Sequence, residues 1–148
     1  MKNIAFVCTG NTCRSPMAEC IFKHMCYENN IKDIKVSSFG LTAKNGENIN
    51  PLAKKMLTKY KIRYKSHKAK KLTDKLLKKQ DYVFVMTNEQ KRVLKKYQNV
   101  YSLAEINGGM EIPDPYGLGE VEYEAVFKVI YASMKKLFDL LTSNGYLK

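Results

Sequence analysis

Short apolar runs alternate along the chain with segments in which apolar residues recur at every third or fourth position. The apolar runs predict four strands, at residues 4–7, 34–39, 82–86 and 100–103. The periodic segments predict five helices, at residues 16–28, 51–60, 74–79, 88–96 and 121–141. Strands that alternate with helices in this way are typical of a parallel sheet covered by helices on both faces. We therefore predict one α/β domain over residues 1–148, without a linker or an internal repeat.

Three of the predicted helices have recognisable start signals, one of which is Thr73 as the expected N-cap of the helix at residues 74–79. Asn50-Pro51 places a capping side chain and a proline at the beginning of one of them. In the first helix, Ser15 is the expected N-cap, with Pro16 at the first helical position and Glu19 in the first turn. The polar segment just before this helix therefore forms the turn between a buried strand and a helix N-terminus.

The chain is strongly basic, with 26 Lys and Arg against 14 Asp and Glu and a net charge of +12. Only Arg14, Arg63 and Arg92 are arginines, whereas nucleic-acid readers depend on Arg for bidentate contacts. No helix-turn-helix, zinc-finger or RNA-binding motif accompanies the charge, so no nucleic-acid partner is expected. No apolar segment approaches the ~18 residues of a membrane span and no signal-like block begins the chain, so no membrane partner is expected either.

The four cysteines lie close together near the start of the chain, at positions 8, 13, 20 and 26. A disulfide framework would spread them through a small secreted chain, and a zinc site would need short paired spacings together with His. Because neither pattern is present, we expect a reducing, cytoplasmic compartment and neither a metal nor a cofactor. Cys20 and Cys26 have apolar neighbours on the first helix and are expected to pack in the core.

The segment Cys-Thr-Gly-Asn-Thr-Cys-Arg-Ser, residues 8–15, carries the most specific chemistry in the sequence. Ligands of open parallel α/β sheets bind beyond the carboxyl ends of the strands, and a helix N-terminus offers unpaired N–H groups to an anion. A loop of small residues at this point can wrap a phosphate with its backbone N–H groups, and Arg14 can donate two hydrogen bonds to phosphoryl oxygens. Cys8 would then direct its sulfur at phosphorus.

The same N–H groups and Arg14 favour the thiolate form of Cys8, which is the nucleophilic form, and Ser15 can donate a hydrogen bond to that sulfur. In the plain structural alternative, Cys8 is a small buried apolar side chain and Arg14 is a surface cation. The position of Cys-x5-Arg between a buried strand and a capped helix favours the phosphate-binding interpretation.

A reaction through a phosphocysteine needs an acid to protonate the leaving group and then a base to activate water. Asp114 is the candidate because flanking prolines stiffen its loop, and the neighbouring Tyr116 can form a wall against the substrate. An Asp between prolines is more often a turn former, so this assignment depends on the Cys8 motif.

Together these motifs resemble the low-molecular-weight protein tyrosine phosphatases over nearly the whole chain. Residues 8–16 are similar to the phosphate loop of that family, Asp114-Pro115-Tyr116 to its general-acid loop, and the order of elements to its flavodoxin-like four-stranded parallel sheet. The resemblance implies Cys8 as nucleophile, Arg14 as phosphoryl clamp and Asp114 as acid and then base. It also implies a set of substrate-binding residues, which are Thr9, Gly10, Asn11, Thr12, Cys13, Ser15 and Tyr116.

The resemblance further implies a buried polar network that holds the phosphate loop. Its members would be Asn11 in the loop, Ser38 in a Ser-x-Gly after the second strand, and His67 in a segment similar to the family's His-x-Ala-basic-x-Leu. Without the resemblance, His67 would be interpreted as a solvated histidine in a basic loop.

Three features resemble the bacterial protein-arginine phosphatase branch of this family rather than its tyrosine-specific members. Thr12 replaces an aliphatic loop residue, Met86-Thr87 replaces Met-Asp, and Tyr116-Gly117 replaces an aromatic pair. The Thr12 hydroxyl can orient a guanidinium N–P centre, whereas a branched alkyl group favours an aryl ester. The expected substrates are phosphorylated proteins that carry phosphotyrosine or phosphoarginine, with phosphoarginine favoured by Thr12, and the expected enzyme is a monomer.

Two other functions use a loop of this kind. Thioredoxin-coupled arsenate reductases have a similar Cys-x5-Arg segment, but they need two further cysteines downstream, and no Cys follows Cys26 here. A non-catalytic module that only binds phosphate would not need both Cys8 and Asp114. Turnover of a generic aryl phosphate distinguishes the enzyme from the binding module.

Overall fold

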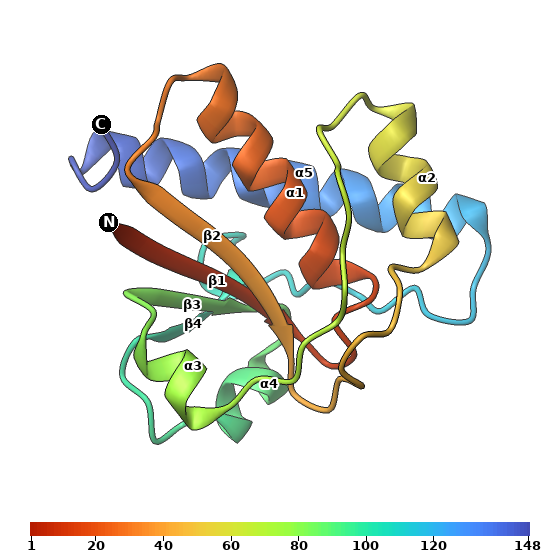
Figure 1. Cartoon of the computed structure of the whole chain (residues 1–148), viewed down its shortest axis with the longest axis horizontal. Helices are drawn as coiled ribbons and strands as arrows, with labels where there is room; N and C mark the ends of the chain where they lie inside the picture. Colours follow the sequence, from red (N-terminus) through yellow and green to blue (C-terminus); the bar gives the residue numbers. More distant parts are fainter.

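The computed structural model describes the whole chain, from Met1 to Lys148. Four strands form one sheet, and they are β1 (Lys2–Cys8), β2 (Ile34–Gly40), β3 (Tyr82–Val85) and β4 (Val100–Ser102). All neighbouring strands are parallel, and their order across the sheet is β2-β1-β3-β4 (Figure 1). The predicted flavodoxin-like, four-stranded parallel sheet is therefore confirmed.

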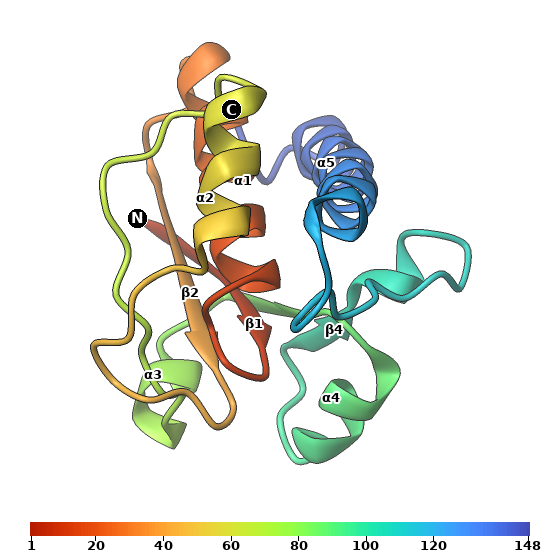
Figure 2. The same cartoon turned by 90° about the vertical axis from the view of Figure 1, so that its right-hand side faces the viewer.

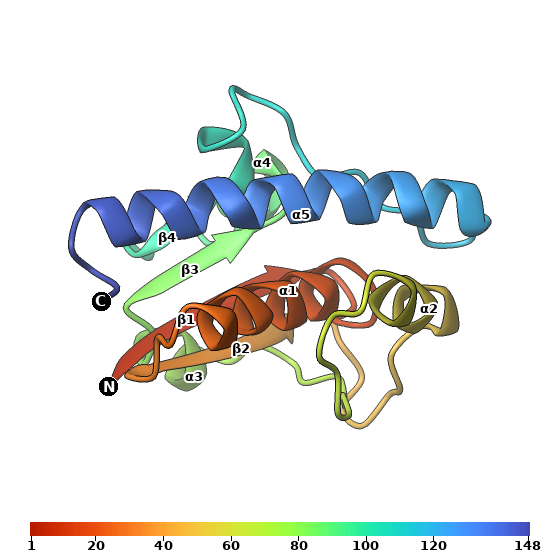
Figure 3. The same ribbon diagram turned by 90° about the horizontal axis from the view of Figure 1, so that it is seen from above.

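Five α-helices and one short 3-10 helix connect and follow the strands. Their bounds are α1 (Arg14–Glu28), α2 (Pro51–Lys59), α3 (Asp74–Lys78), α4 (Asn88–Val93), η1 (Leu103–Glu105) and α5 (Glu120–Ser143). Helices α1, α2 and α5 lie on one side of the sheet, and α3 and α4 lie on the other (Figures 2 and 3). None of the helices combines the length and the apolar character needed to cross a bilayer.

The strands are buried on both faces of the sheet. Because successive side chains of a strand point to opposite faces, Ile4 and Phe6 pack into a large core under α1 and α5. Ala5 and Val7, which alternate with them, join a smaller cluster on the side of α3 and α4. Burial on both faces explains why these strands appear in the sequence as continuous apolar runs.

The start of α1 differs from the sequence prediction in a way that bears on function. The helix begins at Arg14 rather than Pro16, and its N-cap position is Cys13, whose side chain makes no capping hydrogen bond. The prediction that Ser15 caps this helix is wrong, because the Ser15 hydroxyl lies beside the sulfur of Cys8 instead. The predicted first-turn position of Glu19 is also wrong, because the earlier start places it in the second turn.

Two later segments also differ from the prediction. The fourth helix ends at Val93 rather than near residue 96. Residues 103–105 form a 3-10 turn that Ser102 caps through the backbone N–H of Ala104, where the sequence predicted the end of a strand and the beginning of a loop. The last helix is longer than expected and ends at Ser143.

Candidate active site

The segment between β1 and α1 forms a tight loop at the carboxyl end of the sheet, against the end of β2. Leu41 and Thr42 donate backbone hydrogen bonds to the carbonyl oxygens of Cys8, at 2.9 Å, and Thr9, at 3.0 Å. Gly40 permits this close approach, because a Cβ atom there would lie 2.8 Å from the Thr9 carbonyl oxygen. The backbone of the loop that carries Cys8 is therefore attached to the segment at the end of β2.

Asn11 holds the loop from the inside. It is fully buried and has a left-handed φ of 57°, a conformation that Asn adopts more readily than most residues. Its side-chain amide donates to Ser15 Oγ (2.8 Å) and Ser38 Oγ (3.0 Å), and its amide oxygen accepts the backbone N–H of Lys70 (2.9 Å). His67 Nε2 lies 2.7 Å from the Asn11 carbonyl oxygen, an atom that can only accept, so Nε2 carries the proton. The structure thus brings together the three residues predicted to support the loop.

The network extends to Glu19, which the sequence analysis placed only in a helix turn. Ser38 donates its hydroxyl to Glu19 Oε1 at 2.5 Å, and Lys23 Nζ lies 2.5 Å from the other carboxylate oxygen. Because a carboxylate only accepts hydrogen bonds, the Ser38 proton is held by Glu19, and Ser38 accepts from Asn11. Glu19 therefore fixes the Ser38 proton, while the Lys70 N–H on the amide oxygen of Asn11 fixes the direction in which that amide donates toward Ser15. The i, i+4 spacing of Ser15 and Glu19 on one helix is the sequence signal that could have indicated it.

The sulfur of Cys8 lies at the end of this network. It is 2.9 Å from Ser15 Oγ and 3.3 Å from the backbone nitrogen of Asn11. Because the Ser15 hydroxyl accepts from the Asn11 amide, its own proton can go to the sulfur or to the Phe39 carbonyl oxygen, which lies 3.4 Å from Ser15 Oγ. When that proton is directed at the sulfur, Ser15 and the Asn11 N–H are two donors that stabilise negative charge on it.

The other three cysteines have surroundings of a different kind. Burial raises the pKa of the Cys13 thiol, and it raises the pKa of Cys20 to about 12 and that of Cys26 to about 11. All three are therefore thiols at neutral pH. Cys26 is buried in the core, as predicted, while Cys20 is half-buried at the edge of the same core. Cys13 Sγ lies 3.1 Å from the Tyr123 hydroxyl.

Arg14 and Asp114 approach each other beside the loop. The Arg14 side chain is 5% exposed, and its Nη1 donates to the Ile112 carbonyl oxygen at 3.0 Å while Nη2 lies 3.6 Å from Asp114 Oδ2. The Asp114 side chain is 52% exposed, and its Oδ1 accepts the backbone N–H of Tyr116 at 3.1 Å. A phosphate in the loop would meet a guanidinium group that is already held in place, next to a carboxyl group that solvent reaches.

A cavity of about 310 Å³ opens between the loop and Asp114. Eight of the predicted site residues line it, namely Cys8, Thr9, Gly10, Thr12, Cys13, Arg14, Asp114 and Tyr116. The side chains of Asn11, Ser15, Ser38 and His67 lie behind the loop, in the hydrogen-bonded network. No group of three or more His, Cys, Asp and Glu side chains is placed to hold a metal ion.

Two parts of the site were not found by sequence reasoning. One wall of the cavity comes from the segment after β2 and consists of Thr42, Ala43, Lys44 and Glu47. In addition, buried Gln90 donates to Thr9 Oγ1 at 3.2 Å and accepts the backbone N–H of Met86 at 2.8 Å, which ties the loop to the end of β3. A glutamine in a Lys-rich helix carries no sequence signal for this contact.

The comparisons with known proteins agree with this geometry. The family described as low molecular weight phosphotyrosine protein phosphatase matches residues 3–146. The low molecular weight protein-tyrosine-phosphatase PtpA of Staphylococcus epidermidis is 33% identical over an alignment 159 positions long, gaps included, which covers 100% of this chain and 99% of that protein. The chain belongs to the low molecular weight phosphotyrosine protein phosphatase family.

Solved structures of similar proteins include arginine phosphatases. A mutant of the YwlE arginine phosphatase with a phosphorylated active-site serine has a TM-score of 0.91 and 29% identity, with 99% of each chain covered. YwlE arginine phosphatase from Geobacillus stearothermophilus has a TM-score of 0.87 and 26% identity, and the match covers 97% of this chain and 95% of that chain. Proteins named for tyrosine and for arginine phosphatase activity therefore share this fold.

Proposed function

We propose that this chain is a protein phosphatase that hydrolyses phosphoarginine, and less efficiently phosphotyrosine, through a covalent phosphocysteine at Cys8. The proposed reaction rests on one observation, which is that Cys8, Arg14 and Asp114 line the same cavity of about 310 Å³. Membership of the phosphatase family supports the reaction class. Because the cavity is complete within one chain, we expect a monomer that acts on phosphorylated proteins.

In the first step, the Cys8 thiolate attacks phosphorus opposite the leaving group. A sulfur–phosphorus bond forms, and the bond from phosphorus to the guanidinium nitrogen or phenol oxygen breaks. Arg14 and the loop N–H groups stabilise the equatorial oxygens, which carry the charge of the transition state. Asp114 gives its proton to the leaving nitrogen or oxygen. The dephosphorylated side chain then leaves.

In the second step, water attacks the phosphocysteine. Asp114, now a carboxylate, takes a proton from the water, and the sulfur–phosphorus bond breaks. Cys8 leaves as a thiolate, which the Ser15 hydroxyl and the Asn11 N–H receive at 2.9 and 3.3 Å. Inorganic phosphate is the second product, and the enzyme returns to its starting state.

The preference for phosphoarginine rests on Thr12. This residue is half-buried and lines the cavity between Gly10 and Cys13. Its hydroxyl makes only a long contact of 3.8 Å to Cys13 Sγ, so it remains able to hydrogen-bond a substrate. A guanidinium group presents N–H donors next to the bond that breaks, whereas a phenol ring presents none. The structural similarity to arginine phosphatases supports the same substrate.

The substrate assignment is tested by turnover of two peptides that are identical except for phosphoarginine or phosphotyrosine. The native enzyme is expected to have the higher kcat/KM on the phosphoarginine peptide. Thr12→Ile should reverse or strongly reduce that preference, while the matched variant Thr42→Val, at another lining position outside the loop, should keep it. A native enzyme that prefers phosphotyrosine would contradict the arginine assignment and leave the reaction class standing. No hydrolysis of either peptide or of an aryl phosphate would contradict the reaction class.

A further inference from the structure

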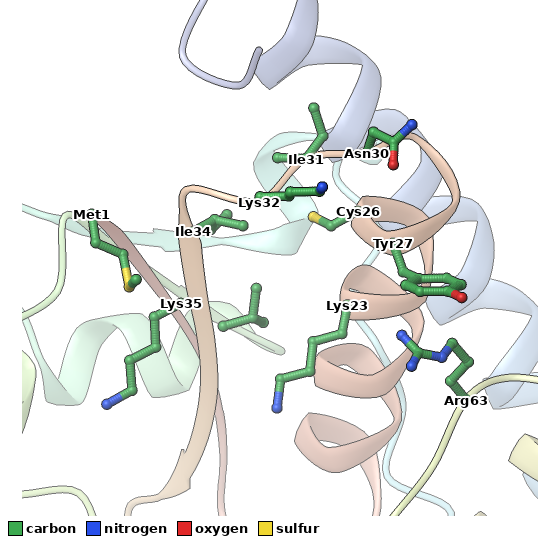
Figure 4. Close-up of a pocket in the computed structure, with 11 residues that line it drawn as sticks. Met1, Lys23, Cys26, Tyr27, Asn30, Ile31, Lys32, Ile34, Lys35 and Arg63 are labelled. Carbon is green, nitrogen blue, oxygen red and sulfur yellow. The ribbon is translucent and has the colours of Figure 1, made fainter.

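A second and larger hollow, of about 640 Å³, lies away from the Cys8 loop, at the start of β2. Its lining residues come from the second half of α1, the turn between α1 and β2, the start of β2, and the single residues Met1 and Arg63 (Figure 4). The proposed reaction uses none of these residues, and none of them lines the cavity beside Cys8.

The rim of the hollow is positively charged. Lys23, Lys32, Lys35 and Arg63 line it, and none of the lining residues is acidic. Lys23 is paired with a carboxylate of the loop-supporting network, but the other three cations form no ion pair. The Arg63 guanidinium lies 3.6 Å from the centre of the Tyr27 ring, which holds it at the rim. Apolar side chains complete the lining, and they include Cys26, Ile31, Ile34 and Val36.

The strand beside the hollow has an open edge. β2 pairs with β1 on one side only. On its other side, the N–H and C=O of Gly40 bond to Lys70 and Leu72, at 2.9 and 2.8 Å, so the backbone groups of Gly40 point away from β1. In a parallel strand this direction alternates from one residue to the next. The backbone groups of Ile34 and Val36 therefore also point outward, and no other segment of the chain bonds to them.

We propose that this groove binds an extended acidic segment of a partner protein, which adds as a strand to the free edge of β2. The backbone of the segment would pair with Ile34 and Val36, which is the usual mode of strand addition. Its apolar side chains would rest on the apolar lining, and its carboxylates would meet Lys35 and Arg63. The site lies outside the catalytic cavity, so it would recruit a substrate or regulator without taking part in the chemistry.

The charges decide between possible occupants. A second copy of this chain, paired edge to edge, would bring Lys35 of one copy near Lys35 of the other, and lysines on an edge strand oppose such pairing. A nucleic acid would match the charge but offers no strand to the outward N–H and C=O groups. An acidic extended peptide satisfies both the charge and the backbone.

Fluorescence anisotropy with the full chain tests this proposal. The probe is a labelled peptide, Glu-Glu-Val-Thr-Val-Glu-Glu, and the comparison probes carry Lys in place of every Glu, or Pro in place of Thr. The acidic probe should bind, and both comparison probes should bind about tenfold more weakly or not at all, because one lacks charge complementarity and the other lacks a ladder N–H. Hydrogen exchange should show slower exchange of the Ile34 and Val36 amides when the acidic probe is bound.

Two double variants separate the groove from general charge. Lys35→Glu with Arg63→Glu should weaken binding of the acidic probe by about tenfold or more. Lys95→Glu with Lys96→Glu makes the same change in net charge near the opposite edge of the sheet and should have a much smaller effect. Unchanged turnover of p-nitrophenyl phosphate shows that each variant is folded. Equal binding by the two double variants, displacement of the probe by inorganic phosphate, or no binding to the native chain would overturn the proposal.

Discussion

The two loops that enclose the catalytic cavity are built differently. The loop from Cys8 to Ser15 is mostly buried, bonded to the end of β2, and held by a fully buried Asn11. The loop around Asp114 is held mainly at its base, where the Ile112 N–H bonds to the carbonyl oxygen of Met86 at 3.0 Å. Its tip is open to solvent, and Tyr116 is 73% exposed.

This difference would separate two tasks in the proposed reaction. Phosphate would meet donors that are fixed before it arrives, so little reorganisation would accompany binding. Asp114, the proposed acid, is kept near Arg14 by one ion pair at 3.6 Å and by the stiffness of two prolines, and its exposed carboxyl group would be accessible to the water of the second step. Changes to the phosphate donors of the first loop should therefore affect binding and chemistry together, whereas changes to its nucleophile or to the second loop should affect chemistry alone.

The largest effect is expected at Cys8 and Arg14. Cys8→Ser should abolish turnover of p-nitrophenyl phosphate but keep binding of inorganic phosphate, because a hydroxyl is a far weaker nucleophile and the loop donors remain. Arg14→Ala should lose both. Calorimetric phosphate binding and steady-state turnover check these outcomes, with Cys20→Ser as the matched control. Substantial turnover by Cys8→Ser would mean that another nucleophile operates.

Asp114→Asn should lower kcat by about 10²–10⁴-fold on a substrate with a poor leaving group, because that step then lacks its acid. The loss should be smaller on p-nitrophenyl phosphate, whose leaving group needs little protonation, and phosphate binding should stay nearly unchanged. Wild-type turnover of a poor leaving group by this variant would assign the acid to a different residue.

A smaller effect is expected from Glu19, which supports the first loop from a distance. Glu19→Gln replaces an acceptor with a group that can also donate, so the direction of the Ser38 hydroxyl proton is no longer fixed. We expect kcat/KM to fall, by less than in Asp114→Asn, with a changed pH profile for kcat/KM. Lys23→Gln removes the ion pair but keeps the Ser38 contact, and it should retain most activity. Equal losses in the two variants would assign the effect to charge alone.

Mild oxidation should inactivate the enzyme reversibly through a disulfide between Cys8 and Cys13. Cys8 would be oxidised first to a sulfenic acid, and Cys13 would then trap it. Because burial raises the pKa of Cys13, trapping should become faster as the pH rises through the neutral range and the thiolate fraction of Cys13 increases. Activity after peroxide and then reductant is the measurement, and Cys13→Ser should recover much less than the native protein. Equal recovery would leave Cys13 as a packing residue.

Removal of divalent metal ions should leave turnover unchanged. The loop N–H groups and Arg14 meet the charge of the phosphate, so the proposed reaction needs no metal ion. Turnover in the presence of EDTA should equal turnover without it. A loss of turnover in EDTA, followed by recovery of turnover when a divalent ion is added, would contradict this mechanism.

The sequence predicts those parts of the molecule whose signals are local. Apolar runs give the strands, Asn50-Pro51 gives the start of α2, and the polar segment from Cys8 to Ser15 gives the turn between β1 and α1. The capping role of Ser15 could not be predicted correctly, because a tertiary contact with Cys8 competes with a local cap. Composition and periodicity could not reveal that contact.

Supporting residues are harder to predict because their partners are distant in the sequence. Glu19 is joined to Ser38 only after β2 is placed beside β1, and Gln90 reaches the first loop from helix α4. His67 was assigned through the family resemblance, and its residue type alone gave no reason to place it against Asn11. Long-range packing, rather than any local pattern, creates these contacts.

The proposed reaction passes through a phosphocysteine at Cys8. Acid quenching of Asp114→Asn during turnover of p-nitrophenyl phosphate, followed by mass spectrometry of the peptide that contains Cys8, would detect this intermediate. This variant should still form the intermediate from a good leaving group but should hydrolyse it slowly. We predict one phosphoryl group on Cys8, absent from the Cys8→Ala, Asp114→Asn double variant, which has no nucleophile at position 8. Turnover by Asp114→Asn without any phosphorylated Cys8 would contradict the claim.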